Sequence, residues 1–143
     1  MVAVSERVEI DAPVGAVFDH MDDPHNQSEI SPSITDIRDV EQDETGKSLA
    51  FTYEMAGMPL DGRLETRIYE PEERIVFEMD GTLSGTITWE FEPTDGGTRV
   101  TYEAEYDLPA GVLETVVRPF AERYNERELR TTLENLKTRV ETA

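Results

Sequence analysis

The residues in this sequence best suited to acid–base chemistry are one carboxylate and several tyrosines on predicted strands. Residues 2–10 place Val or Ile at alternate positions, and Glu6 falls on the same apolar face. Burial would favour the protonated form of Glu6 and make it a general acid or base. The alternative is that a bulge or the sheet end lets Glu6 reach water. Tyr53 and Tyr106 face inward in the same kind of pattern, and they are either further catalytic candidates or ordinary core residues.

The two histidines and two nearby aspartates could be arranged as a metal site. His20 and His25 lie near Asp22 and Asp23 in the chain. However, His20 lies off the apolar stripe of its predicted helix, and His25 follows Pro24 in a turn. We therefore expect a solvated pair and no metal site. Without a nucleophile elbow, an HExxH motif or a phosphate loop, the sequence also predicts no cofactor.

Two strand registers remain open near Asp36 and Arg38. These residues share the phase of Ile34 and Val40, so one register turns an ion pair inward. The other register turns Ile37 inward and leaves both charges outside. The sequence does not decide between them.

The elements that must position these residues alternate with period two from residue 34 to about residue 108. A strand and a short helix precede this stretch. The helix has one apolar side, formed by Val14, Val17, Phe18 and Met21. Asp11 is expected to cap this helix, with Pro13 near its first turn. One more helical turn fits residues 25–31. Strands over 34–40, 49–55, 60–68, 75–79, 83–91 and 100–108 are joined by turns at 56–59, 71–73 and 95–97. Such hairpins predict an antiparallel sheet with one apolar face.

Residues 109–143 form the long helical stretch that must cover this face. Leu129, Leu133, Leu136 and Val140 make one apolar stripe. The stripe of Val112, Leu113, Val116, Val117 and Phe120 lies roughly half a turn away on a straight helix. Pro119 separates the two, so we expect a short helix, a break near residues 118–119 and a longer helix that docks on the sheet. The fold class is α+β, with about seven strands wrapped around the C-terminal helix.

Composition excludes several classes of function. The chain has 143 residues, no cysteine, and 32 acidic against 13 basic residues, for a formal net charge of -19. The absence of cysteine excludes a disulfide scaffold. With no long apolar run and no signal leader, we expect one cytoplasmic domain over residues 1–143 that does not span a membrane. No Lys/Arg patch exists to bind phosphates, which disfavours nucleic acid.

The acidic residues occur in every segment, while Lys47 and Lys137 are the two lysines. This pattern resembles the proteins of salt-adapted archaea. At molar salt the screening length falls to about 3 Å, so that the self-repulsion largely vanishes. The alternative is an acidic face that docks a basic protein partner.

The order of elements resembles the START-like (SRPBCC, helix-grip) superfamily, which includes polyketide cyclases, coenzyme Q-binding proteins and birch-pollen-type allergens. The resemblance is carried by SERVEIDAPVGAVFDHMDDPHN, by the six strands that follow, and by the closing LENLKTRVE. The strand–DAP–helix entry and the Leu-x-x-Leu-Lys ending are most similar to the polyketide cyclase/dehydrase-type or coenzyme Q-binding-like branch. The glycine-rich loop of the pollen-allergen branch is replaced here by EQDETGKS, which has one glycine.

The resemblance implies a cavity between the sheet and the terminal helix that takes an apolar or amphipathic ligand. The alternative is that both helical stripes simply fill the core. The residues expected to line such a cavity face inward from the strands or form the first stripe: Phe51, Tyr53, Met55, Leu64, Thr66, Phe77, Ile87, Trp89, Tyr102, Tyr106, Leu113, Val116, Val117 and Phe120.

Three functions fit these expectations. The first is a non-catalytic binder or carrier of a lipid, quinone or polyketide-like compound. The second is a cyclase or dehydratase, which requires Glu6, Tyr53 or Tyr106 to converge on one point. The third is a protein-interaction module, which requires an exposed apolar patch, with Met55–Met58 as the candidate segment.

Overall fold

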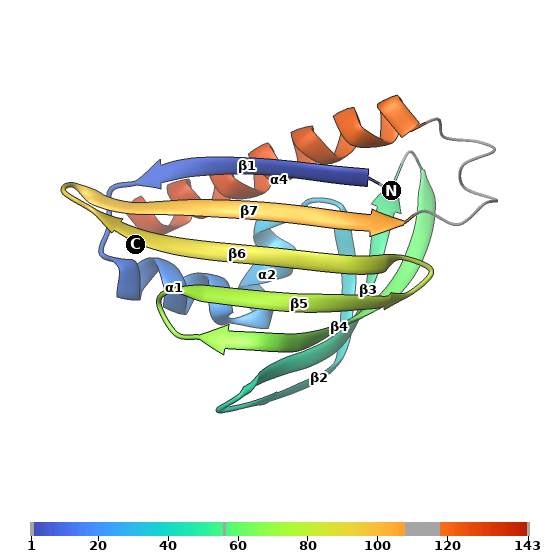
Figure 1. Cartoon of the computed structure of the whole chain (residues 1–143), viewed down its shortest axis with the longest axis horizontal. Coiled ribbons are helices and arrows are strands. Elements are labelled where there is room, and N and C mark those ends of the chain that lie inside the picture. The colour runs from blue at the N-terminus through green and yellow to red at the C-terminus, as the bar shows by residue number, and fades with distance from the viewer. Residues whose placement is uncertain (1, 56, 108–117, 143) are drawn as a thin grey trace.

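A computed structural model describes residues 2–55, 57–107 and 118–142. A curved antiparallel sheet of seven strands carries short helices after its first strand and a long C-terminal helix (Figure 1). This confirms the predicted α+β class. The elements in chain order are β1 (Val2–Ile10), α1 (Val14–Asp22), α2 (Pro24–Ile30), β2 (Ile34–Asp43), β3 (Gly46–Met55), β4 (Met58–Glu70), β5 (Arg74–Gly81), β6 (Ser84–Thr94), β7 (Gly97–Asp107) and α4 (Arg118–Glu141).

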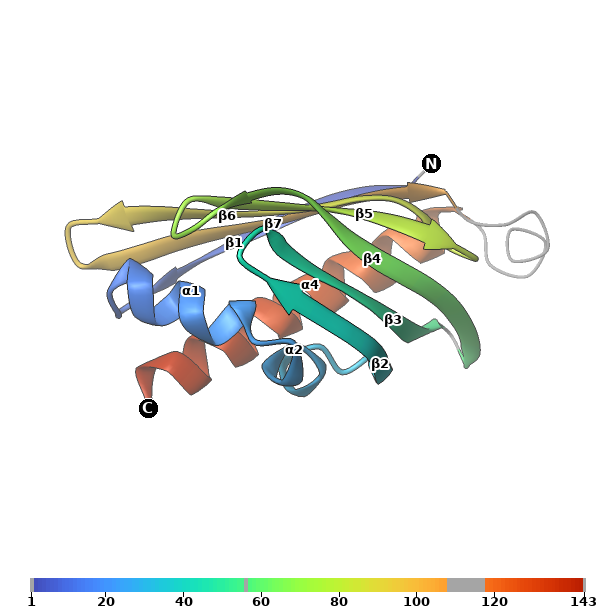
Figure 2. The same ribbon diagram turned by 90° about the horizontal axis from the view of Figure 1, so that it is seen from below.

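The strand order is β1-β7-β6-β5-β4-β3-β2, so that consecutive hairpins form a meander and the first strand pairs with the last. The helices lie on the concave face, where the sheet bends around α4 (Figure 2). Helix α4 packs chiefly against β1. Among the described residues, no helix is both long and apolar enough to cross a membrane.

The two short helices begin where the sequence provides local signals, although not all of them as expected. Helix α1 buries Val17, Phe18 and Met21, as its spacing predicts. Its N-cap is Pro13 without a side-chain hydrogen bond, so the predicted cap at Asp11 is wrong. The Asp11 amide instead donates to Glu141 of α4. Helix α2 is capped by Asp23, whose carboxylate accepts from the backbone N–H of His25.

A bulge in β2 settles the register that the sequence left open. The pairing with β3 shifts between Ile34 and Asp36, after which Ile37 faces Phe51 and Arg38 faces Ala50. Both Ile34 and Ile37 therefore pack against the core. Asp36 and Arg38 lie outside and form an exposed ion pair of 3.0 Å.

A second bulge, in β4, changes which side chain reaches the interior. The pairing with β5 shifts between Thr66 and Ile68. Ile68 pairs with Val76, whereas Tyr69 pairs with the fully buried Ile75 and packs against the core. The period-two pattern predicted for this strand is therefore interrupted after Thr66.

Helix α4 docks through the predicted anchor stripe. Leu129, Leu133, Leu136 and Val140 are all buried. Pro119 lies in the first turn of α4, where a missing N–H costs no helical hydrogen bond. The helix predicted before Pro119, with its stripe from 112 to 117, lies outside the described residues.

Candidate functional site

A small enclosed cavity lies between the concave face of the sheet and helix α4. Its volume is about 40 Å³. Both bulged and regular strands contribute to its wall, as do α2 and α4. The lining residues are Gln27, Ser31, Ile34, Phe51, Tyr53, Leu64, Met79, Leu83, Ile87, Tyr102, Ala104, Tyr106, Asn125, Glu128 and Leu129.

The apolar part of the wall comes from alternate positions of the central strands. Phe51 on β3 pairs with Gly62 on β4, and both are buried. A Cβ atom at Gly62 would lie 2.8 Å from Cζ of the Phe51 ring. Glycine therefore leaves the space in which this ring packs, which sets one boundary of the cavity.

Tyrosine hydroxyls form much of the polar part of the wall. Tyr53 donates to the side-chain oxygen of Asn125 at 3.3 Å, which joins β3 to α4 across the cavity. Tyr102 stacks on Trp89 with ring centroids 4.0 Å apart. Burial raises the pKa of Tyr53, Tyr102 and Tyr106, so all three hydroxyls stay protonated and can donate hydrogen bonds.

Glu128 brings a carboxylate to the same wall. Its Oε1 accepts from the Ser33 amide and its Oε2 from the Ser33 hydroxyl, each at 2.9 Å. The Ser33 hydroxyl also contacts that of Tyr124 at 3.1 Å. The negative charge of Glu128 adds to burial in raising the pKa of Tyr53 and Tyr102. The carboxylate is thus fixed in orientation beside the phenols.

Two polar atoms of the wall are buried without a hydrogen-bond partner. They are the hydroxyl of Tyr106 and Oε1 of Gln27, on residues that are 4% and 3% exposed. Buried polar groups are nearly always paired, because an unmade hydrogen bond costs roughly 1–3 kcal/mol. Both residues line the cavity, so the missing partners point to an occupant that can make hydrogen bonds.

The three catalytic candidates do not converge. Tyr53 and Tyr106 line the cavity, whereas Glu6 is absent from its wall. Glu6 shares the face that α4 covers, and its carboxylate accepts from Arg130 at 2.8 Å. Glu6 therefore lies at the edge of the face that α4 covers, where its side chain is 25% exposed and pairs with Arg130 of that helix.

The structure separates the predicted cavity residues into groups. Six lie in the cavity wall: Phe51, Tyr53, Leu64, Ile87, Tyr102 and Tyr106. Met55, Phe77 and Trp89 are fully buried elsewhere in the core. Phe120 is 49% exposed, Thr66 lines another hollow, and Leu113, Val116 and Val117 lie outside the described residues.

Trp89 and Phe77 have other neighbours in the core, and Trp89 stacks beside Phe91 with ring centroids 6.5 Å apart. Phe18 of α1 packs edge-on against Phe91, with centroids 5.2 Å apart. The Lys47 ammonium lies 5.5 Å from the centroid of the Phe77 ring. Phe18 of α1 therefore packs on a part of the concave face that lies outside the cavity wall.

Helix α4 and helix α2 supply lining residues that the pattern analysis missed. Asn125 lies one turn before Leu129 and therefore continues the anchor stripe. That spacing was the signal that could have identified it. Gln27 and Glu128 had no such signal, because their roles depend on how α2 and α4 meet the sheet.

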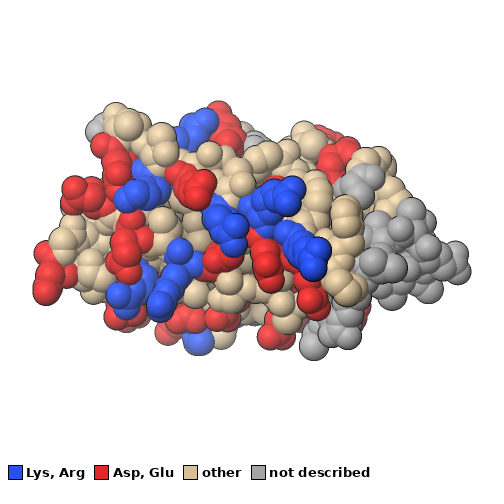
Figure 3. All heavy atoms as spheres, turned by 90° about the horizontal axis from the view of Figure 1, so that it is seen from above, with Lys and Arg blue, Asp and Glu red and all other residues tan. Residues whose placement is uncertain are grey.

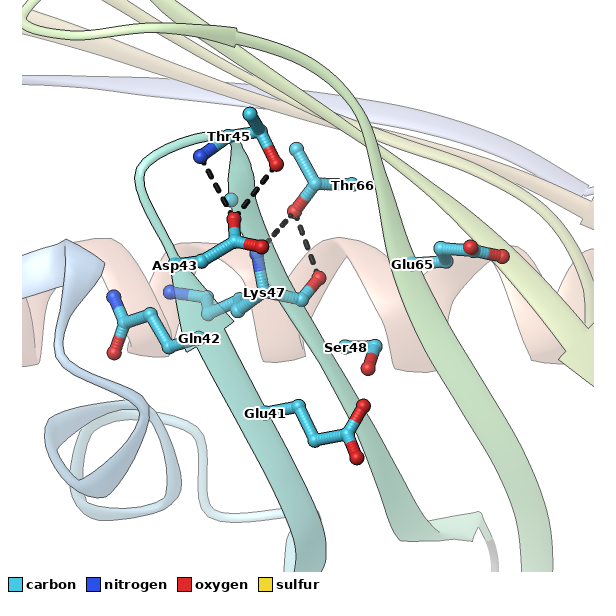
Figure 4. A pocket seen from close by; sticks show the side chains of 9 residues that line it. Glu41, Gln42, Asp43, Thr45, Lys47, Ser48, Glu65 and Thr66 are labelled. Atoms are coloured by element: carbon cyan, nitrogen blue, oxygen red, sulfur yellow. Dashed lines mark hydrogen bonds between the residues drawn. The ribbon is translucent and has the colours of Figure 1, made fainter.

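Three other hollows are larger but open to solvent. Their volumes are about 240, 360 and 350 Å³, and charged side chains line each of them. In the first hollow, the Asp43 carboxylate accepts hydrogen bonds from the backbone N–H and the hydroxyl of Thr45. The Thr66 hydroxyl accepts from the backbone N–H of Lys47 and donates to its carbonyl (Figure 4). These polar groups already satisfy one another, so the hollow is a product of the hairpin turn.

The structure also bears on a metal site and on an apolar patch at the β3–β4 hairpin. Among the described residues, no three His, Asp or Glu side chains are grouped so as to hold a metal ion. At the β3–β4 hairpin, Met55 is fully buried and Met58 packs against the core. In the described part of the chain, the large hydrophobic residues that remain exposed are Val40 and Phe120. The described tip therefore offers no apolar patch to a protein partner.

A curved sheet around a C-terminal helix, with a small cavity between them, defines a helix-grip fold. The family described as polyketide cyclase / dehydrase and lipid transport matches residues 1–141, and the chain belongs to this family. No curated protein matches the chain.

Solved structures share the fold at low sequence identity. A protein from Thermus thermophilus superposes with a TM-score of 0.86 at 20% identity, over 96% of each chain. The Zhui aromatase/cyclase from a Streptomyces species gives a TM-score of 0.78 at 15% identity, over 97% of this chain and 93% of that one. The di-domain StfQ from the steffimycin biosynthetic pathway gives 0.77 at 17% identity, over 99% of this chain and 51% of that one.

Proposed function

We propose that residues 1–143 act as one domain that binds and carries a small hydrophobic molecule, of the lipid, quinone or polyketide-like kind. The site is the cavity between the sheet and α4. The observation that carries this proposal is the pair of unpartnered polar atoms, on Gln27 and Tyr106, in an otherwise largely apolar enclosure. Apolar walls with a few convergent polar groups are typical of ligand sites. Membership of a family that includes lipid transport supports the same conclusion.

Binding must enlarge this cavity. At about 40 Å³ it accommodates only a few waters, at roughly 10–15 Å³ each, whereas small-molecule sites usually measure roughly 300–1,000 Å³. Helix α4 is held mainly by β1 at the sheet edge, away from the central strands that form the apolar wall. A small displacement of α4 from those strands would break the hydrogen bond of Tyr53 to Asn125 and add volume, while keeping the anchor of the helix on β1.

Native mass spectrometry of gently purified protein tests the proposal directly. We expect a bound molecule of a few hundred daltons that is lost on denaturation. Thermal unfolding with added 2-naphthol gives a second readout, since a ligand that binds only the folded state raises the midpoint. Repeated absence of a bound molecule, together with no shift from neutral aromatic probes, would rule out the carrier function.

An enzymatic role is the second candidate, and one specific observation favours it. The Glu128 carboxylate and the Tyr106 hydroxyl line the same cavity, which is the arrangement that a dehydration needs. Glu128 would accept a proton from the carbon beside a ketone. Tyr106 would give its proton to the departing β-hydroxyl, so that water leaves as the carbon–carbon double bond forms.

A simple β-hydroxyketone separates the enzyme from the carrier. 4-Hydroxy-4-phenyl-2-butanone loses water to give 4-phenyl-3-buten-2-one, whose conjugation absorbs in the near ultraviolet. An enzyme should turn over many equivalents, and Glu128→Gln should abolish turnover but retain binding. Binding without turnover in the wild-type protein would favour the carrier.

We further propose that the chain is adapted to high salt, as in salt-adapted archaea. Acidic and basic side chains are interspersed on the face shown in Figure 3. Several acids are paired with arginine, as in the contacts of Glu78 with Arg67 and of Glu9 with Arg99. Each such pair is neutral, so the pairs leave the whole formal net charge of -19 uncompensated.

A further inference from the structure

The cavity wall is unusual in its charge. Glu128 is a carboxylate in this wall, and none of its described lining residues is a lysine, arginine or histidine. Both oxygens of Glu128 are held by Ser33, so the charge cannot readily turn away. An anionic ligand would therefore meet a fixed like charge, in a place where low effective dielectric strengthens the repulsion.

We propose that this site selects an uncharged hydroxylated or carbonyl-bearing hydrophobic compound and rejects carboxylates such as fatty acids. The inference rests on the proposed binding function and defines its ligand class. The unpaired Tyr106 hydroxyl is a donor, and the unpaired Oε1 of Gln27 is an acceptor. A ligand hydroxyl can accept a hydrogen bond from such a donor or donate one to such an acceptor, and a ligand carbonyl can accept from the donor.

The apolar part of the wall fixes the rest of the ligand. The five interior strands β3 to β7 each give an apolar side chain to the wall, among them Leu64, Met79 and Ile87. A ligand that brings its polar group to Tyr106 must bury its remaining surface against these side chains. An aromatic alcohol or phenol meets both conditions, whereas a carboxylate meets only the second.

Three naphthalene probes of similar shape test the selection. We would measure the affinities of 2-naphthol, methyl 2-naphthoate and 2-naphthoate by NMR titration of the full-length protein at neutral pH. The two neutral compounds should bind at least about tenfold more tightly than the carboxylate. Equal affinity of 2-naphthoate and its methyl ester would overturn the selection but leave the binding function intact. Failure of all three compounds to bind would overturn both.

Two variants assign the selection to named atoms. Glu128→Gln removes the charge and keeps one acceptor for Ser33, so it should raise the affinity for naphthoate relative to that for naphthol about tenfold. Tyr106→Phe should weaken naphthol about tenfold, and Gln27→Leu should do so independently. Thermal unfolding of each variant confirms that it folds. If Tyr106→Phe and Gln27→Leu both bind naphthol like the wild type, the unpaired atoms serve only a trapped water, and the ligand class is wrong.

Discussion

Lys47 and Asp22 form a buried contact that joins strand β3 to the end of helix α1. The Lys47 ammonium donates to the Asp22 carbonyl at 2.6 Å and lies 3.5 Å from its carboxylate. The Lys47 side chain is 1% exposed. Tyr69 donates to the other carboxylate oxygen of Asp22 at 2.6 Å. Burial lowers the pKa of Lys47, and the charge of Asp22 opposes this shift. Lys47, one of the two lysines in the chain, therefore links β3 to α1 from a buried position.

Replacing this lysine should be costly. Lys47→Met keeps the apolar stem but leaves the Asp22 carbonyl and carboxylate without their cationic donor. We expect a loss of about 3 kcal/mol in the free energy of unfolding, as for a broken buried pair. Lys137→Met is the matched control, since Lys137 is 40% exposed in its ion pair with Glu141, and it should change stability by about 0.5 kcal/mol at most. Urea denaturation gives the free energy of unfolding of both variants. An equal loss in Lys47→Met and Lys137→Met would show that the buried contact of Lys47 does not stabilise the fold.

The buried tyrosines predict how stability depends on alkaline pH. Burial raises the pKa of Tyr53, Tyr102 and Tyr106 above the usual 10.0. Burial and the hydrogen bond to Asp22 raise the pKa of Tyr69 to about 12. Because each folded-state pKa exceeds the unfolded value, this contribution to stability is fully present below about pH 10 and is lost as pH rises above it.

A spectrophotometric titration measures this effect. As pH rises, the tyrosinate absorbance of the native protein should increase at a higher pH than that of the urea-unfolded protein. The increase should coincide with unfolding of the native protein. In Tyr69→Phe, one tyrosine fewer should titrate near pH 12. If the native absorbance rises smoothly near pH 10 while the fold persists, these hydroxyls are accessible and the assignment of burial fails.

The fold was predictable because its signals are local and repeated. Alternation along β3 to β7 places apolar residues such as Leu64 and Val100 on one face, and spacing in α4 does the same for Leu133. The bulges in β2 and β4 were not predictable, because each depends on pairing with the neighbouring strand. They determine that Ile37 and Tyr69 reach the core.

The candidate site was only partly predictable, for a related reason. Tyr53 and Tyr106 were found by strand phase, which requires only one strand at a time. Glu128 and Gln27 become lining residues only when α4 and α2 meet across the sheet. The sequence left open whether Glu6 reaches water, because its partner Arg130 is 124 residues away and no local pattern connects them.

Net charge predicts a dependence of stability on salt. With -19 formal charges, the folded chain repels itself at low ionic strength, and the repulsion is relieved when it unfolds. Raising NaCl from about 0.05 M to about 1 M shortens the screening length to about 3 Å. The free energy of unfolding should increase on the order of 2 kcal/mol, or roughly 6 °C in the melting midpoint. KCl should act equally. A midpoint that is constant or falls with salt would contradict adaptation to high salt.

The contact of Gly62 with Phe51 offers a way to change the cavity without changing its polar groups. In Gly62→Ala, the added methyl would lie 2.8 Å from the Phe51 ring, so the ring must move into the cavity. We expect 2-naphthol to bind about tenfold more weakly, while overpacking lowers the free energy of unfolding by about 1–2 kcal/mol. Gly96→Ala is the control, because no atom lies within 4 Å of its added Cβ, and it should leave naphthol affinity unchanged. Calorimetric titration gives the affinity and urea denaturation the stability. If Gly62→Ala binds naphthol as tightly as Gly96→Ala does, the ligand does not occupy the space beside Phe51, and the site must be sought elsewhere.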